Sequence, residues 1–117
     1  MPTPSRPHDA EVLFELTAPR LDGSEKQVFS GYRPEYDIRP NYLTCTHHDF
    51  DDPAGAVTGK PVRARIWFLT PEVYPFTLWI GRVLKVSEGS RIVGRATITK
   101  VTNRLMLSLN GAPVDFS

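Results

Sequence analysis

Residues 62–68 read VRARIWF, and this stretch decides the fold class. The residues Val62, Ala64, Ile66 and Phe68 alternate with Arg63, Arg65 and Trp67. Successive side chains of a β-strand point to opposite faces, so apolar residues at every second position line one face. The stretch therefore predicts a half-buried strand with one apolar and one basic face.

The same period of two recurs on both sides of this stretch. Val12, Phe14 and Leu16 alternate with Glu11 and Glu15. We also expect strands at about 42–47, 76–86 and 91–101, with a bend at position 81, a hairpin turn at 87–90, and short kinked strands between prolines in 27–47. No helical period of useful length occurs. About six strands without helices predict an all-β fold, a closed barrel or a sandwich.

The segments outside these strands differ in composition. Residues 1–9 hold three prolines and little apolar surface, which predicts a flexible N-terminal arm. Residues 49–61 are rich in turn formers and are expected to form a loop. We assign residues 10–102 to one barrel domain and residues 103–117 to a C-terminal extension, where Leu105, Leu107 and Leu109 suggest one more short strand.

The composition is that of an ordinary soluble domain. Of 117 residues, 40% are apolar and 23% charged, and no apolar run reaches the roughly 18 residues of a membrane span. The first ten residues lack the apolar segment of a secretory signal. A single cysteine, Cys45, fits a reducing compartment. We expect a cytoplasmic protein that does not contact a membrane.

Charge is distributed unevenly along the chain. Residues 1–59 carry five Lys and Arg against ten Asp and Glu, whereas residues 60–117 carry nine against three. The basic residues of the later strands are Arg63, Arg65, Arg82, Lys85, Arg91, Arg95 and Lys100. Such cations would suit an RNA backbone, and Trp67, Trp79 or Tyr74 could pack against its bases or sugars. The alternative is the ordinary solvated outer face of a β-sheet.

Three motifs are candidates for chemistry. The histidines His47 and His48 with Asp49 supply metal-ligand types, and Cys45 beside them suggests a nucleophile and base. Adjacent histidines on a strand point to opposite faces, so we favour an acidic loop and a structural cysteine over a small metal- or cysteine-dependent enzyme. Gly59-Lys60 lacks the rest of a phosphate-binding loop. We therefore predict no metal, cofactor or bound nucleotide.

The order of motifs resembles the C-terminal domain, domain 3, of bacterial elongation factor Tu. Residues 29–36, FSGYRPEY, resemble the F-x-GYRP-x-F motif that opens this domain, and residues 88–94, EGSRIVG, resemble its EGGRTVG hairpin. Residues 10–16, 60–68 and 78–86 resemble its strands, and residues 99–101, TKV, resemble its terminal AKV. The resemblance covers about residues 10–102.

The resemblance implies a six-stranded antiparallel β-barrel that, in the factor, helps to hold aminoacyl-tRNA and contacts the exchange factor and the GTPase domain. The matching positions are Arg33 in the GYRP corner and Arg91 and Gly94 in the hairpin. The GTPase domain has no counterpart in this sequence, so we expect no GTPase activity. The acidic cluster in residues 47–52 would repel phosphate on an RNA-binding side.

We therefore expect a non-enzymatic binding module. One version binds tRNA or related RNA, and the other binds a translation-associated protein without RNA, as a mimic or adaptor for an exchange factor, an elongation factor or a toxin. The predicted partner-binding residues are Arg33, Arg63, Arg65, Arg91, Gly94 and Arg95.

Overall fold

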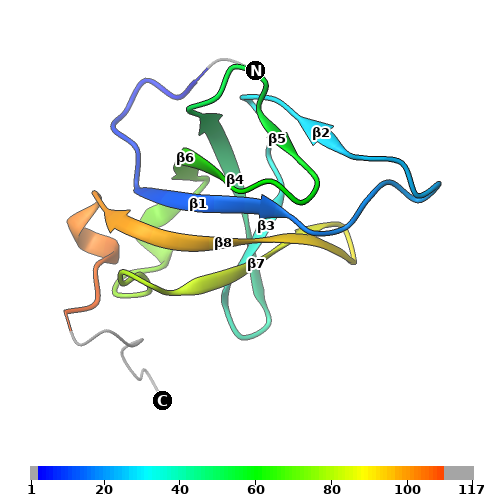
Figure 1. The fold of residues 1–117 in the computed structure, drawn as a ribbon. Coiled ribbons are helices and arrows are strands. Elements are labelled where there is room, and N and C mark those ends of the chain that lie inside the picture. Colours follow the sequence, from blue (N-terminus) through cyan, green and yellow to red (C-terminus); the bar gives the residue numbers. More distant parts are fainter. Residues whose placement is uncertain (1–2, 110–117) are drawn as a thin grey trace.

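The computed structural model describes residues 3–109 and forms a closed antiparallel β-barrel (Figure 1). The strands are β1 (Ala10–Leu16), β2 (Gln27–Val28), β3 (Glu35–Arg39), β4 (Tyr42–Phe50), β5 (Ala56–Val57), β6 (Val62–Phe68), β7 (Val83–Glu88) and β8 (Arg91–Val101). Two 3₁₀ turns, η1 (Pro71–Val73) and η2 (Arg104–Met106), are the helical elements of the described residues. The prediction of an all-β, six-stranded barrel is confirmed.

The barrel strands follow the order β1-β6-β4-β3-β7-β8, and β8 closes the barrel by pairing with β1. Closure removes the unpaired strand edges that an open sheet would expose. The residues that the period of two assigned to the interior are buried there, among them Val12, Phe14 and Leu16 of β1 and Ala64, Ile66 and Phe68 of β6. The fold follows from this alternation.

Two segments differ from their predictions. The strand expected at 76–86 begins only at Val83. Gly81 has φ +92° and the chain turns there, with the N–H of Arg82 donating to the carbonyl of Trp79 at 3.1 Å. The loop expected at 49–61 contains β5, which pairs with β2 in a separate two-stranded sheet. These two strands lie beside one end of β1 (Figure 1).

The prediction of a short strand near residues 105–109 is also wrong. Residues 104–106 form η2 instead, and Leu107 makes one isolated bridge to Leu78. The side chain of Met106 is fully buried in the barrel core. Met106, which the sequence grouped with the extension, therefore belongs to the core. The extension after residue 109 lies outside the described residues.

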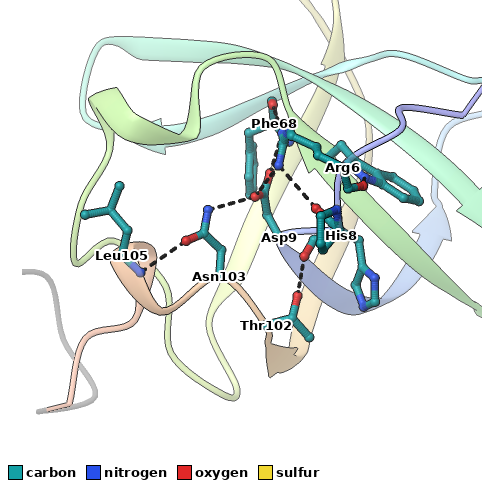
Figure 2. A network of polar contacts seen from close by, with 9 residues as sticks. Arg6, His8, Asp9, Phe68, Thr102, Asn103 and Leu105 are labelled. Carbon is teal, nitrogen blue, oxygen red and sulfur yellow. Dashed lines mark hydrogen bonds and ion pairs between the residues drawn. The ribbon is translucent and has the colours of Figure 1, made fainter.

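The residues before β1 are tied to the barrel by the buried carboxylate of Asp9 (Figure 2). Arg6 binds both of its oxygens, at 2.7 and 3.0 Å, and donates a further bond to the carbonyl of Phe68 at 2.6 Å. The N–H of Phe68 and the side-chain amide of Asn103 donate to the same carboxylate at 2.7 and 2.9 Å. One carboxylate thus joins the expected N-terminal arm, β6 and the segment after β8.

Candidate functional site

The outer face of the barrel carries the basic residues that the sequence singled out. Arg63 and Arg65 of β6 and Arg95 of β8 are all exposed. Around them lie the outward-facing charged residues of β1, β4 and β8. We call this set the charged wall: Glu11, Glu15, Asp49, Arg63, Arg65, Arg95 and Lys100.

Cations and carboxylates alternate across the charged wall. Arg65 lies opposite Glu11 on one side and forms an ion pair with Asp49 on the other. Arg95 forms an ion pair with Glu15 at 2.8 Å. Paired cations have less attraction left for a phosphate backbone, because binding RNA would place phosphates next to these carboxylates.

The hairpin residues occupy two different settings. Arg91 is half-buried and donates to the carbonyl of Pro19 at 2.5 Å. It lines an open depression of about 610 Å³, together with Arg20, Leu21, Asp22, Lys26 and Glu88. Lys26 and Glu88 are themselves paired at 2.9 Å. The depression therefore contains both cations and carboxylates, as the charged wall does.

Gly94 is buried and packs against β1. A Cβ added at this position would lie 2.3 Å from the carbonyl oxygen of Glu15, well inside van der Waals contact. Glycine lets the two backbones approach this closely. The described structure thus gives Gly94 a packing role and leaves it no exposed surface of its own for a partner.

The GYRP corner leads from β2 into β3 and borders a different site. The Tyr32 hydroxyl donates to Glu88 at 2.6 Å, and the burial of Tyr32 and this bond raise the pKa of its hydroxyl. Arg33 follows with its side chain exposed and lines a cavity of about 200 Å³ with Cys45 and His47. The structure therefore places Arg33 at the same cavity as Cys45 and His47.

His48 points the opposite way, into the core, as expected for neighbours on a strand. Its Nδ1 atom lies 3.1 Å from the carbonyl of Thr46, so Nδ1 carries the proton and Nε2 accepts from the Tyr36 hydroxyl at 2.6 Å. Complete burial lowers the pKa of His48 to about 3. His48 is neutral and does not share a site with Cys45 and His47.

His47 faces outward, but the N-terminal residues and Trp67 cover it. The two rings meet edge to face with 5.5 Å between their centroids, and His47 is 6% exposed. Burial, with the charge of Arg33, lowers the pKa of its imidazole. Within residues 3–109, no group of three or more His, Cys, Asp or Glu side chains is arranged to hold a metal ion.

Sequence reasoning missed an apolar surface at one end of the barrel. Val73 of η1, Phe76 and Leu105 of η2 are 53%, 42% and 45% exposed. The N–H of Phe76 donates to the carbonyl of Leu105 at 3.0 Å, and η1 packs against η2. We call these three residues the apolar end. The two 3₁₀ turns lie where β8 ends (Figure 1).

Phe76 adopts an unusual backbone conformation. Its φ of +58° lies in the left-handed region, which costs a residue with a Cβ about 1–2 kcal/mol. Strained residues of this kind cluster at functional sites. The period of two assigned Phe76, Leu78 and Ile80 to one face of a strand. That alternation does not predict the positive φ of Phe76.

No protein-family model matches the sequence. The resemblance to domain 3 of elongation factor Tu stays a prediction. Among the described residues, no helix has the length and apolar character needed to cross a membrane. The chain is thus described by its fold and surfaces: a small closed β-barrel with a charged wall and an apolar end.

Proposed function

We propose that this protein is a non-enzymatic binding module of the cytoplasm whose partner is another protein. The observation that carries the proposal is the apolar end, where Phe76 is held in a strained conformation with 42% of its surface exposed. Aromatic and apolar side chains grouped on a surface are typical of protein interfaces. The partner would present a complementary apolar surface.

The charge arrangement supports a protein partner over tRNA. Surfaces that bind RNA concentrate unpaired cations, and their affinity falls steeply with salt. Arg65 and Arg95, which we expected to contact RNA, are instead paired with Asp49 and Glu15. The proposal includes an ancestry in domain 3 of elongation factor Tu. In that factor the corresponding barrel also binds proteins, which agrees with a protein partner here.

Affinity capture from cell extract with matched variants tests the proposal. Leu105→Glu places a charge in the apolar end, and Leu13→Glu places the same charge on the outer face of β1, where the leucine is 40% exposed. We expect the wild type and Leu13→Glu to capture one protein that Leu105→Glu does not. Capture should persist after ribonuclease treatment and from about 50 mM to about 300 mM salt.

Two results would contradict the proposal. Capture that disappears with ribonuclease or with salt would instead support the RNA-binding version. Equal capture by Leu105→Glu and Leu13→Glu, with both variants folded, would show that the partner does not use the apolar end.

A further inference from the structure

The residues before β1 lie against the ends of β4 and β6 without joining the sheet. Between residues 3–8 and residues 9–109, no hydrogen bond runs from backbone to backbone. We call residues 3–7, TPSRP, the strap. The strap is held through side chains, as a peptide docked on a protein surface is.

A buried carboxylate of the barrel holds the arginine of the strap (Figure 2). Asp9 is fully buried, and its N–H donates to the carbonyl of Ile66 at 2.8 Å. Its carboxylate accepts from Phe68 and Asn103, so the barrel fixes it without help from the strap. The carboxylate oxygens accept from Arg6 at 2.7 and 3.0 Å, and the carbonyl of Phe68 accepts a third bond at 2.6 Å. These three acceptors match the planar fork of a guanidinium.

A second carboxylate adds negative charge at this place. The hydrogen bond and charge of Asp9, with the charge of Glu72 in η1, raise the pKa of the Arg6 guanidinium against the effect of its partial burial. The side chain of Arg6 is still 40% exposed. An arginine therefore reaches the buried carboxylate from the solvent side, without any opening of the barrel.

Trp67 holds the backbone of the strap beside this arginine. Its Nε1 atom donates to the carbonyl of Arg6 at 2.8 Å. The strap has a proline on each side of the arginine, and the first of these, Pro4, lines a cavity together with Trp67. Grooves with aromatic side chains recognise proline-rich segments, which lose little conformational entropy because the proline ring fixes φ. Trp67 and Asp9 thus form a groove for proline and arginine.

The strap does not fill this groove. A cavity of about 200 Å³ remains between the strap and the barrel, where the lining residues are Arg33, Cys45, His47, Trp67, Phe68 and Leu69. Leu69 keeps 64% of its surface exposed. A segment with a larger apolar side chain beside the arginine would bury more of this surface than the strap does.

We propose that this groove binds a segment of another protein that carries proline two positions before arginine, and that the strap is its internal competitor. A segment tethered by a short linker has an effective concentration in the millimolar range, so the strap occupies the groove until a better-fitting segment displaces it. No residue of the apolar end lines the cavity, so the inference goes beyond the proposed function.

Peptides copied from the strap test the proposal. The probe is acetyl-TPSRP-amide, and its control has citrulline in place of arginine, which keeps the shape and removes the charge. Arg6→Gly in the full chain removes the guanidinium of the strap, with circular dichroism to confirm folding. Arg20→Gly is the matched control, because this exposed arginine lines a different depression. In a Trp79→Phe background, Trp67 is the remaining tryptophan and reports on the groove.

We expect the arginine peptide to give a saturable change in Trp67 fluorescence with Arg6→Gly, with a dissociation constant on the order of 1 mM or below. The citrulline peptide should bind about tenfold more weakly or worse, because it lacks the charge that Asp9 and Glu72 attract. Proteins with an intact strap, the wild type and Arg20→Gly, should bind the arginine peptide about tenfold more weakly than Arg6→Gly, because the strap competes.

The wild type gives a second measurement, which does not depend on the folding of a variant. Saturation-transfer NMR detects weak binding, and we expect transfer from the protein to the proline protons of the arginine peptide and much less to those of the citrulline peptide.

The proposal is overturned if a folded Arg6→Gly protein does not saturate by about 10 mM peptide, or if the wild type shows no transfer to the arginine peptide at that concentration. Equal binding of the two peptides would also overturn it. So would equal affinity of Arg6→Gly and Arg20→Gly for the arginine peptide, because the peptide would then bind outside the groove.

Discussion

The charged wall and the apolar end are both exposed, but they differ in whether their side chains have partners within the protein. On the wall, Arg65 and Arg95 face the carboxylates of Asp49 and Glu15. At the apolar end, Phe76 and Leu105 leave 42% and 45% of their surfaces to solvent. A row of cations along one strand is therefore weak evidence for a polyanion partner until the charges on the neighbouring strands are known.

Gly94→Ala is expected to have the largest effect on stability. The new Cβ would collide with the carbonyl oxygen of Glu15 in β1, which forces two paired backbones apart. We expect the free energy of unfolding to fall by about 3 kcal/mol or more, measured by urea unfolding. Thr97→Ala on the same strand is the control and should change it by less than about 1 kcal/mol. If Gly94→Ala is as stable as the control, β8 does not pack on β1 as closely as described.

Acid should destabilise the barrel through His48, whose side chain is buried inside the barrel. Burial lowers the pKa of His48 in the folded protein to about 3, whereas the unfolded chain takes up this proton near 6.5. The unfolded state is therefore favoured as the pH falls, and the free energy of unfolding should drop by about 1.4 kcal/mol per pH unit below about 6.5.

Urea unfolding between about pH 7.5 and pH 5 measures this slope, and His48→Gln, if folded, should reduce it. NMR of the His48 ring gives a direct check on the wild type, because the ring should stay neutral at pH 5. A folded-state titration of His48 near its ordinary pKa would contradict the core placement and the Tyr36 hydrogen bond.

Phe76→Gly separates binding from stability at the apolar end. Glycine adopts a positive φ without strain, so the gain of about 1–2 kcal/mol should offset the loss of the partly buried ring. We expect a free energy of unfolding within about 1 kcal/mol of the wild type and a loss of partner capture. A large loss of stability would mean that Phe76 serves the core, and retained capture would remove it from the interface.

The smallest expected effect concerns the wall itself. A double-mutant cycle of Glu15→Gln and Arg95→Gln should give a coupling energy of about 0.2–1 kcal/mol, because the arginine is well exposed. The coupling should decrease at high salt. A coupling energy of zero at low salt would mean that Arg95 is available to other ligands, which would weaken the contrast with the apolar end.

The fold was predictable from the sequence because the period of two is unbroken in the central barrel strands. In β1 and β6 the alternation assigned the correct residues to the core. It could not predict that Trp67, on the outer face, would be covered by Arg6 and its neighbours, because that contact joins segments about 60 residues apart. The turn at Gly81 likewise depends on a backbone angle that an apolar run does not reveal.

The candidate site was predicted less well for a related reason. The arginines were correctly placed on outer faces, but the pairing of Arg65 with Asp49 depends on the register of β4 and β6. Counting charges along the chain does not show which residues of neighbouring strands lie opposite each other. Phe76 and Leu105 come together only because residues after β8 return to the segment before β7.

Site-specific photo-crosslinking tests the central claim most directly. The photoreactive residue p-benzoylphenylalanine would replace Phe76 in one protein and Leu13 in another, and both would be irradiated in the same cell extract after ribonuclease treatment. The account predicts one crosslinked protein band from position 76 and none from position 13. Crosslinking from position 13 alone, or no crosslink at position 76 when the captured partner is present, would contradict it.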